Sequence, residues 1–281
     1  MTINNAFEPM GDHSPQPFHQ VRLTGAAPVL LLSQAAGMGV QGKSLHTHPE
    51  GQFYFAMHGL IVVETAQGRV IMPPGRVGWI PPMVPHGATV IGSTKSIAPD
   101  ISVGFTLYLL PALCAQFPPE PTVLSLSGMM REILKRMQQW PQQQPLSDTR
   151  QRLLAVFMDE IHAAELEPLR LKMPVSRQLV TLASVIADDP ADDTSLEDWG
   201  QRLGMSSRTI TRRFREETGL SVSSWRQVAR LQRALEMLGD GDSVTSVAIT
   251  LGYESVSSFI ALFRRLIGTT PAKFAADIRR A

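Results

Sequence analysis

Short apolar runs alternate with turn residues through the first part of the chain, from Val21 to Leu110. Four of these runs, with Gly and Pro between them, are Gln52 to Ala56, Leu60 to Glu64, Arg69 to Met72 and Gly78 to Ile80. Runs of this length bounded by turn signals are typical of β-strands. Their spacing, about ten residues, favours a small antiparallel barrel or sandwich that hides its edges by closure.

A helical period replaces this pattern further along the chain. Apolar residues then recur at intervals of three and four, and the stretch Pro141 to Pro145 divides them into two helices: Ile133, Leu134 and Met137, then Leu153, Leu154, Phe157 and Ile161. A third helix is predicted after Pro174, with Leu179, Leu182 and Ile186 on one face. The stripe on the second helix either packs on the β-domain or pairs with its copy in a dimer.

An acidic loop at residues 188–193 marks the domain boundary, and a length of 281 residues suits two domains. The predicted fold class is α+β, with an N-terminal β-barrel, a helical connector and an all-α C-terminal domain. The predicted parts are a flexible tail at 1–20, the barrel at 21–110, a connector and candidate dimerisation segment at 111–187, and the C-terminal domain at 188–281.

The C-terminal domain begins with a helix, a short turn and a second helix. Ser195 with Asp198, or Thr194 with Glu197, has the spacing of a capping box that starts the first helix, which Gly204 ends. The second helix is predicted at Ser207 to Thr218. Once Ile210 and Phe214 face inward, the residues left outside are Arg208, Thr209, Thr211, Arg212 and Arg215. This arrangement is a helix-turn-helix, although one such unit alone is also compatible with an ordinary basic surface helix.

The same pattern occurs a second time, which favours DNA binding. A helix around Val244 to Leu251 is followed by Gly252 and by a helix from Ser255 to Ile267 with Phe259 and Phe263 inside. A helix from about Val222 to Leu238 separates the units as a rigid spacer. Two units on one chain can place their second helices in successive major-groove segments about 34 Å apart.

The positive charge of the chain is concentrated in the predicted DNA-binding domain. Residues 195–281 hold 13 Lys and Arg against 9 Asp and Glu, a net of +4, whereas residues 1–194 hold 13 against 16, a net of −3. Twelve of the 13 C-terminal cations are arginine, whose planar fork suits phosphates and guanine edges.

Residues 195–279 resemble the DNA-binding domain of the AraC/XylS family of transcription regulators. The resemblance depends on Leu203 to Ser206, Phe214 to Gly219, Arg230 with Leu231, Ala248, Leu251 to Ser255, Phe259, Phe263 to Arg265, Gly268, Pro271 and Phe274. It implies base-reading positions at Arg208, Thr211 and Arg212 in the first unit, and at Val256, Ser257, Ser258 and Ala261 in the second, with Arg264 beside them. Because Val256, Ile260 and Ala261 offer no hydrogen bonds, we expect the second unit to use phosphates, thymine methyl groups and DNA shape.

Histidines dominate the chemistry of the N-terminal domain. His46 and His48 lie two residues apart, so on a strand they point to one side, where His86 can join them to bind a divalent metal. This segment resembles a cupin barrel in which Gln52 replaces the usual glutamate. The neutral amide removes an anionic ligand. His46, His48 and His86 therefore either hold a metal or line an effector pocket with Gln52, and Tyr54 and Trp79 are candidates to stack on a planar effector.

These features predict a sequence-specific transcription regulator whose cupin-like domain senses a small-molecule effector. The alternatives are a metal-dependent cupin enzyme fused to a DNA-binding domain, and an architectural DNA binder without a sensor. The expected partners are a double-stranded DNA operator, the effector, RNA polymerase and a second copy of the chain. No targeting or membrane-spanning segment is recognisable, which predicts a cytoplasmic protein without a membrane partner. The single cysteine, Cys114, is expected to be a buried apolar residue.

Overall fold

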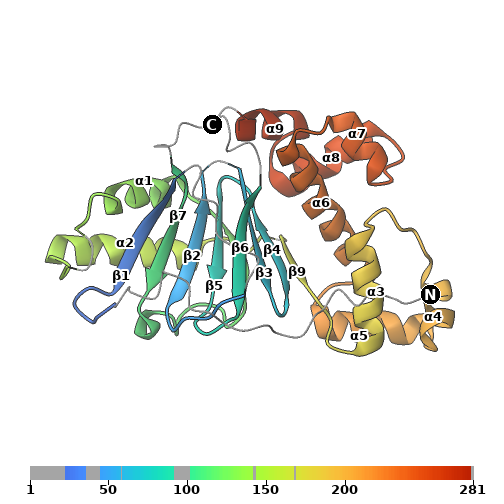
Figure 1. The fold of residues 1–281 in the computed structure, drawn as a ribbon, viewed down its shortest axis with the longest axis horizontal. Helices are drawn as coiled ribbons and strands as arrows, with labels where there is room; N and C mark the ends of the chain where they lie inside the picture. Colours follow the sequence, from blue (N-terminus) through green and yellow to red (C-terminus); the bar gives the residue numbers. More distant parts are fainter. Residues whose placement is uncertain are drawn as a thin grey trace.

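The structure of the chain is a computed structural model that describes residues 23–35, 45–57, 59–91, 102–141, 144–167 and 169–279. The predicted tail at 1–20 lies outside the described residues. An N-terminal region rich in strands is followed by a C-terminal region of helices (Figure 1), which confirms the predicted α+β class.

The strands form two antiparallel sheets. The five-stranded sheet has the order β1 (Val29–Ala35), β7 (Ser102–Leu109), β2 (Gly51–Ala56), β5 (Arg76–Ile80) and β8 (Thr122–Ser125). The four-stranded sheet has the order β6 (His86–Ile91), β3 (Leu60–Thr65), β4 (Gly68–Met72) and β9 (Arg170–Lys172).

The prediction of a closed barrel is wrong. Within the described ranges no strand ladder joins the two sheets, and the isolated bridges His46–His86 and Leu124–Leu166 lie at their margins. Unpaired edge strands of an open sheet can pair with another chain. Here the edge strands β8 and β9 are short, and α6 (Val222–Asp240) contacts β9.

Helices cover the five-stranded sheet on the side away from the four-stranded one. The side chains of Phe53, Phe55 and Trp79 lie in one buried cluster with α1 (Gly128–Met137) and α2 (Asp148–Ala163). A 3-10 helix, η3 (Pro111–Leu113), follows β7. The α2 residues Leu154, Phe157 and Ile161 are buried in this cluster, so the apolar stripe packs on the sheet, the first of its two predicted uses.

The C-terminal helices lie on the opposite side, next to the four-stranded sheet (Figure 1). They are α3 (Arg177–Asp188), α4 (Leu196–Leu203), α5 (Ser207–Thr218), α6, α7 (Val244–Thr250), α8 (Val256–Ile267) and α9 (Pro271–Arg279). One buried cluster runs from the sheet residues Val62 and Val70 into the α6 residues Leu231, Leu235 and Leu238. The two parts of the chain therefore share a continuous apolar interface.

Helix α3 packs with the first helix-turn-helix. Its buried residues Leu179, Leu182 and Ile186 share a cluster with Trp199 of α4, Phe214 of α5 and Trp225 of α6. The Glu217 carboxylate of α5 accepts hydrogen bonds from the backbone N–H groups of Val175 and Ser176, both at 2.8 Å. This carboxylate satisfies amides at the start of α3.

Candidate functional site

The first helix-turn-helix is built from α4 and α5. Ser195 caps α4, because its hydroxyl accepts a hydrogen bond from the Asp198 N–H at 3.1 Å, as in the first of the two predicted boxes. Gly204 ends the helix with φ 65°, a conformation that favours glycine. At Gly200 a Cβ would lie 2.6 Å from the Met205 carbonyl oxygen, so the close approach of the turn requires glycine there.

The exposed face of α5 carries most of the predicted reading residues. Arg208, Thr211, Arg212 and Arg215 are exposed, whereas Ile210 and Phe214 are buried. Thr209 is half-buried, and its N–H donates to the Ser206 hydroxyl, which caps the helix. The Thr211 hydroxyl donates to the Ser207 carbonyl at 2.9 Å. Arginines therefore supply most of the donors on this face.

A carboxylate that sequence reasoning missed lies beside Arg212. Its Nη1 donates to both oxygens of Glu216 at 2.8 and 2.9 Å, and the two side chains are 62% and 57% exposed. Their i,i+4 spacing on one helix was the available signal. An exposed pair of this kind stabilises by about 0.3–0.5 kcal/mol, and it leaves Arg212 Nε and Nη2 outside the pair.

The second unit repeats this construction with a less polar surface. The Ser255 hydroxyl caps α8 by accepting from the Ser258 N–H at 3.1 Å, and the Ser258 hydroxyl donates to the Ser255 carbonyl. Val256 is half-buried, while Ser257, Ala261 and Arg264 are exposed. Together with Ile260 and Arg265, Ser257, Ala261 and Arg264 line a shallow hollow. Its small apolar floor and flanking arginines suit methyl groups and phosphates.

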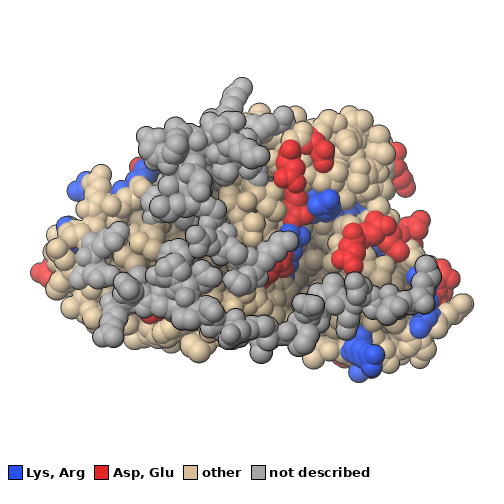
Figure 2. Space-filling model, viewed as in Figure 1, with Lys and Arg blue, Asp and Glu red and all other residues tan. Residues whose placement is uncertain are grey.

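Charged side chains of both signs lie next to one another over the C-terminal helices on the face that Figure 2 shows. The positive excess of residues 195–281 is therefore not spread over this face. Local placement on α5 and α8 decides where an anion can bind.

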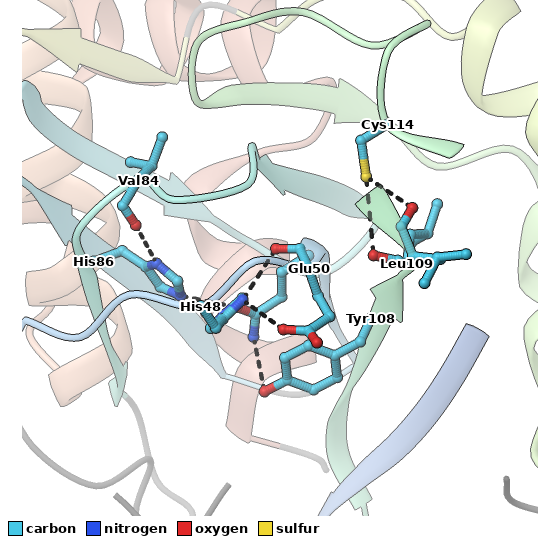
Figure 3. Close-up of polar contacts among 9 residues, drawn as sticks. His48, Glu50, Val84, His86, Tyr108, Leu109 and Cys114 are labelled. Carbon is cyan, nitrogen blue, oxygen red and sulfur yellow. Dashed lines mark hydrogen bonds and ion pairs between the residues drawn. The ribbon is translucent and has the colours of Figure 1, made fainter. Parts of the chain in front are cut away.

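A second polar site lies at the ends of β2 and β6, where the structure brings the three predicted histidines together. Figure 3 shows two of them, His48 and His86. One nitrogen from each of His46, His48 and His86 lies within 4.8 Å of the others. The Gln52 side chain lies between two of them, with Oε1 at 2.9 Å from His48 Nε2 and 2.8 Å from His86 Nε2. The Gln52 amide nitrogen donates to the Tyr108 hydroxyl at 3.3 Å.

Backbone carbonyl groups determine which ring nitrogens of His48 and His86 carry a hydrogen. His86 Nδ1 lies 2.8 Å from the Val84 carbonyl and His48 Nδ1 lies 3.0 Å from the Glu50 carbonyl, so each Nδ1 must carry the hydrogen. A neutral imidazole has only one N–H. The neutral His86 ring therefore presents its Nε2 lone pair to Gln52 Oε1, which is also an acceptor, and a neutral His48 ring would do the same. The conflict is removed if the amide turns its NH₂ group inward, if His48 carries a second proton beside Glu50, or if a cation is bound among these three atoms.

Burial fixes the protonation state of His86 and of the nearby tyrosines. Desolvation lowers the pKa of His86 to about 3, and the neighbouring His46 and His48 lower it further against the opposing Val84 bond. Burial, assisted by Glu50, raises the pKa of Tyr108 to about 12. Burial also raises the pKa of Tyr54. These rings are neutral near pH 7.

The two predicted aromatic residues lie on opposite faces of the sheet. Tyr54 is on the face of Gln52, and its ring centroid lies 6.3 Å from that of His86. Trp79 pairs with Phe53 on the other face, packs against Phe117 and donates its Nε1 hydrogen to the Pro118 carbonyl. The structure therefore does not bring Trp79 to the histidines. Tyr108, which the sequence reasoning missed, is there because it is in register with Gln52.

Two helix-turn-helix units, joined by one spacer helix and each exposing a polar second helix, define a DNA-binding regulator. A helix-turn-helix domain family matches residues 199–277. The HTH-type transcriptional regulator NimR of Escherichia coli (strain K12) is 29% identical over 243 residues, which cover 86% of each chain.

Two solved structures are similar over 36% of this chain. A DNA-binding transcriptional dual regulator from Escherichia coli K-12 is 32% identical over 98% of its chain, with a TM-score of 0.33. The DNA-binding domain of AdpA, a global transcriptional factor solved in complex with a target DNA, is 30% identical over 92% of its chain, with a TM-score of 0.34.

The C-terminal region belongs to the AraC family of helix-turn-helix DNA-binding domains, and the chain as a whole is similar to an HTH-type transcriptional regulator. These relatives are regulators and not enzymes, so the interpretation as a metal-dependent cupin enzyme is set aside. Among the residues that the structure describes, no helix is long and apolar enough to cross a membrane.

Proposed function

We propose that the polar site of the N-terminal sheets is an effector site whose occupancy changes how the C-terminal helices bind an operator. The site consists of His46, His48, Gln52 and His86, with Tyr54 and Tyr108 beside them. In this proposal the chain is a ligand-controlled regulator and not an architectural DNA binder.

One observation carries the proposal, namely that the Nε2 atoms of His48 and His86 and the side-chain amide of Gln52 face one another in a largely buried place. Gln52 and His86 are 2% and 1% exposed. Buried polar groups without donors are costly, so the cluster is satisfied either by a turned Gln52 amide or, as we propose, by a bound partner that supplies positive charge or hydrogen. The carbonyl bonds at each Nδ1 orient both rings with Nε2 inward, which is how second-shell oxygens orient metal-binding histidines.

A divalent transition metal fits this donor set best. Imidazole nitrogens with one neutral amide oxygen suit zinc, copper or nickel. Harder ions prefer carboxylate ligands, and position 52 carries a glutamine and not a glutamate. In this scheme His46, His48 and His86 hold the ion and Gln52 Oε1 faces it. A small organic donor that hydrogen-bonds to the same atoms is the second effector class compatible with the site.

Titration of the full chain separates these cases. After treatment with a chelator, zinc chloride or nickel chloride is added in a calorimeter, and operator affinity is measured with and without the metal on duplexes selected from random DNA by the full chain. We expect binding of one ion, abolished by His86→Ala and unaffected by His162→Ala at an exposed position of α2. Metal binding that leaves operator affinity unchanged would contradict the sensor role, and absence of metal binding would leave only the organic class.

We propose that both second helices contact double-stranded DNA, with Arg208, Thr211, Arg212 and Arg215 on α5. On α8 the contacts come from Val256, Ser257, Ser258, Ala261 and Arg264. Thr209 is placed at the helix start, where it supports the cap and faces a phosphate. The α5 contacts supply most of the base reading, because α8 offers few donors.

The remaining partners follow from this role. We propose that the chain acts in the cytoplasm, contacts RNA polymerase at its promoter, and forms a homodimer. Since the α2 stripe is buried on the sheet, a dimer uses another surface. Sedimentation of the full chain at tens of micromolar tests the dimer, and a monomer at that concentration would exclude it.

A further inference from the structure

Arg76, the first residue of β5 in the five-stranded sheet, contacts α8, the second helix of the second helix-turn-helix and here called the second reading helix. Its Nη2 donates to the carbonyl oxygen of Ile267, the last residue of α8, at 3.2 Å. Its Nε lies 2.9 Å from Glu167 Oε1, and the two side chains are 18% and 14% exposed. The guanidinium is thus held by a largely buried carboxylate while it binds the C-terminal end of α8. Helix C-termini favour a cation, because their last carbonyls have no partner within the helix.

The backbone around Arg76 is also held in place. Its N–H donates to the Pro73 carbonyl, and the Gly75 carbonyl accepts from the Leu126 N–H at 3.2 Å. Arg76 pairs with Ser125 of β8. Because the Arg76 backbone is fixed in the sheet, a shift of β5 moves the guanidinium that binds the end of α8.

The same strand reaches the polar site at its other end. Arg76 is the first residue of β5, and Ile80, the last, is in register with Gln52. The five residues of β5, at about 3.3 Å each, therefore connect the polar site with the contact between Arg76 and α8. The turn at residues 81–85 then leads from Ile80 to His86, and its Met83 N–H donates to the His48 carbonyl at 2.9 Å.

Met83 adds a strained point to this turn. Its φ is 61°, a left-handed conformation uncommon for a residue with a side chain, and its side chain is 62% exposed. A change at His48 or His86 therefore acts on a turn that is already held away from its relaxed conformation. In contrast, α1 and α2 share their buried cluster with the five-stranded sheet and not with the reading helices.

We infer that Arg76 is a positioning residue for α8, and that β5 carries the state of the polar site to the second reading helix. The first half concerns DNA reading alone. The second half rests on the proposed effector function. In this arrangement the sheet domain sets the orientation of α8 relative to α5, so the contribution of the second half-site depends on contacts made outside the DNA-binding domain.

The test of the first half uses no ligand. A cleavage reagent tethered at Ser257→Cys identifies the half-site that α8 reads, and affinities are then measured on the selected duplex and on one with that half-site scrambled. Arg76→Ala is expected to lower affinity for the intact duplex about five- to tenfold and to leave the scrambled duplex unchanged. Arg76→Lys, which keeps the cation, should retain most of the affinity, and Arg152→Ala on α2 is the matched control.

Equal losses on both duplexes, no loss, or a gain on the intact duplex would each overturn the positioning role. Thermal unfolding of every variant shows whether a loss reflects misfolding, and rescue by Arg76→Lys separates a lost cation from a damaged strand. In a second experiment zinc chloride is added. Zinc should change protection of the second half-site in the wild-type chain but not in Arg76→Ala. If zinc binds and both respond alike, β5 is not the route. If zinc does not bind, the metal proposal fails while the ligand-free result still decides the role of Arg76.

Discussion

At the residue scale, the arginines of α5 differ in what surrounds them. Arg212 is held by Glu216, one turn further along the helix, whereas no ion pair is formed by Arg208 or Arg215 among the described residues. A guanidinium held in one orientation presents its fork at a lower entropic cost than a mobile one. Arg212 is for this reason the residue on α5 best suited to a bidentate contact with guanine.

Arg212→Ala is expected to cost about 1 to 3 kcal/mol at the specific operator while leaving non-specific affinity nearly intact, because a base contact is lost. Competition binding against random-sequence DNA measures both quantities. Arg152→Ala, an exposed arginine on α2, serves as the control. A uniform loss on every sequence would instead make Arg212 a phosphate contact.

His86 makes the stability of the metal-free chain depend on pH. Its pKa is lowered to about 3 in the folded state from 6.5, so between these values the unfolded chain binds a proton that the folded chain does not. Stability is therefore complete above pH 6.5 and falls as the pH decreases towards 3, by about 1.4 kcal/mol per pH unit. Urea unfolding with a chelator, at pH 7.5 and pH 5.5, should show this loss in the wild-type chain. The loss should be smaller in His86→Asn and unchanged in His162→Asn.

At the element scale, glycine permits the close approach that forms the first turn. We expect Gly200→Ala to destabilise the chain by about 1 to 3 kcal/mol, because its new methyl group would meet the Met205 carbonyl oxygen at 2.6 Å. Gly128 opens α1, and a methyl group added there would have nothing within 4 Å, so Gly128→Ala should be neutral or stabilising. Thermal unfolding compares the two. A loss of equal size in both would refute the steric explanation.

Helix α3 belongs energetically with the DNA-binding helices. A fragment 188–281, which begins at the predicted boundary, lacks α3 and exposes the apolar surfaces of Trp199, Phe214 and Trp225 that α3 covers. We expect a fragment 174–281 to unfold cooperatively and the shorter one to be much less stable, since three buried apolar side chains contribute several kcal/mol. Circular dichroism on heating distinguishes them, and equal melting temperatures would show that α3 is dispensable.

Local signals explain which elements the sequence could predict. The helix predicted at Ser207 to Thr218 has the same bounds in the structure, because its capping serine and following glycine are neighbours in the chain. The three-residue strand β9 was missed, since Leu171 is defined as a strand residue only by pairing with Arg69 about a hundred positions earlier. Trp79 was misplaced and Tyr108 missed for a related reason: which face and which register a strand adopts depends on partners distant in sequence.

At the scale of the whole molecule, the two parts of the chain are joined by a polar contact inside an apolar interface. Arg69 of β4 binds Glu64 of β3 and Glu236 of α6, and Glu236 also lies 3.3 Å from Arg233 Nη1. Nearby, the Gln232 amide donates to the Leu169 carbonyl at 2.9 Å. These contacts fix α6 on the sheet at a particular register, which apolar packing alone specifies poorly. The spacer between the two reading helices is therefore held by the N-terminal domain.

The Arg69–Glu236 pair should show asymmetric energetics. The Glu236 side chain is only 6% exposed, so water solvates its carboxylate poorly, whereas that of Arg69 is 30% exposed and keeps Glu64. Arg69→Met therefore leaves a buried carboxylate with one weak partner and is expected to cost about 3 kcal/mol or more, while Glu236→Leu costs less. The double variant should be no less stable than Arg69→Met alone, because the stranded charge is gone. Urea unfolding of the three variants measures the coupling, and additive losses would mean that the two side chains act independently across the interface.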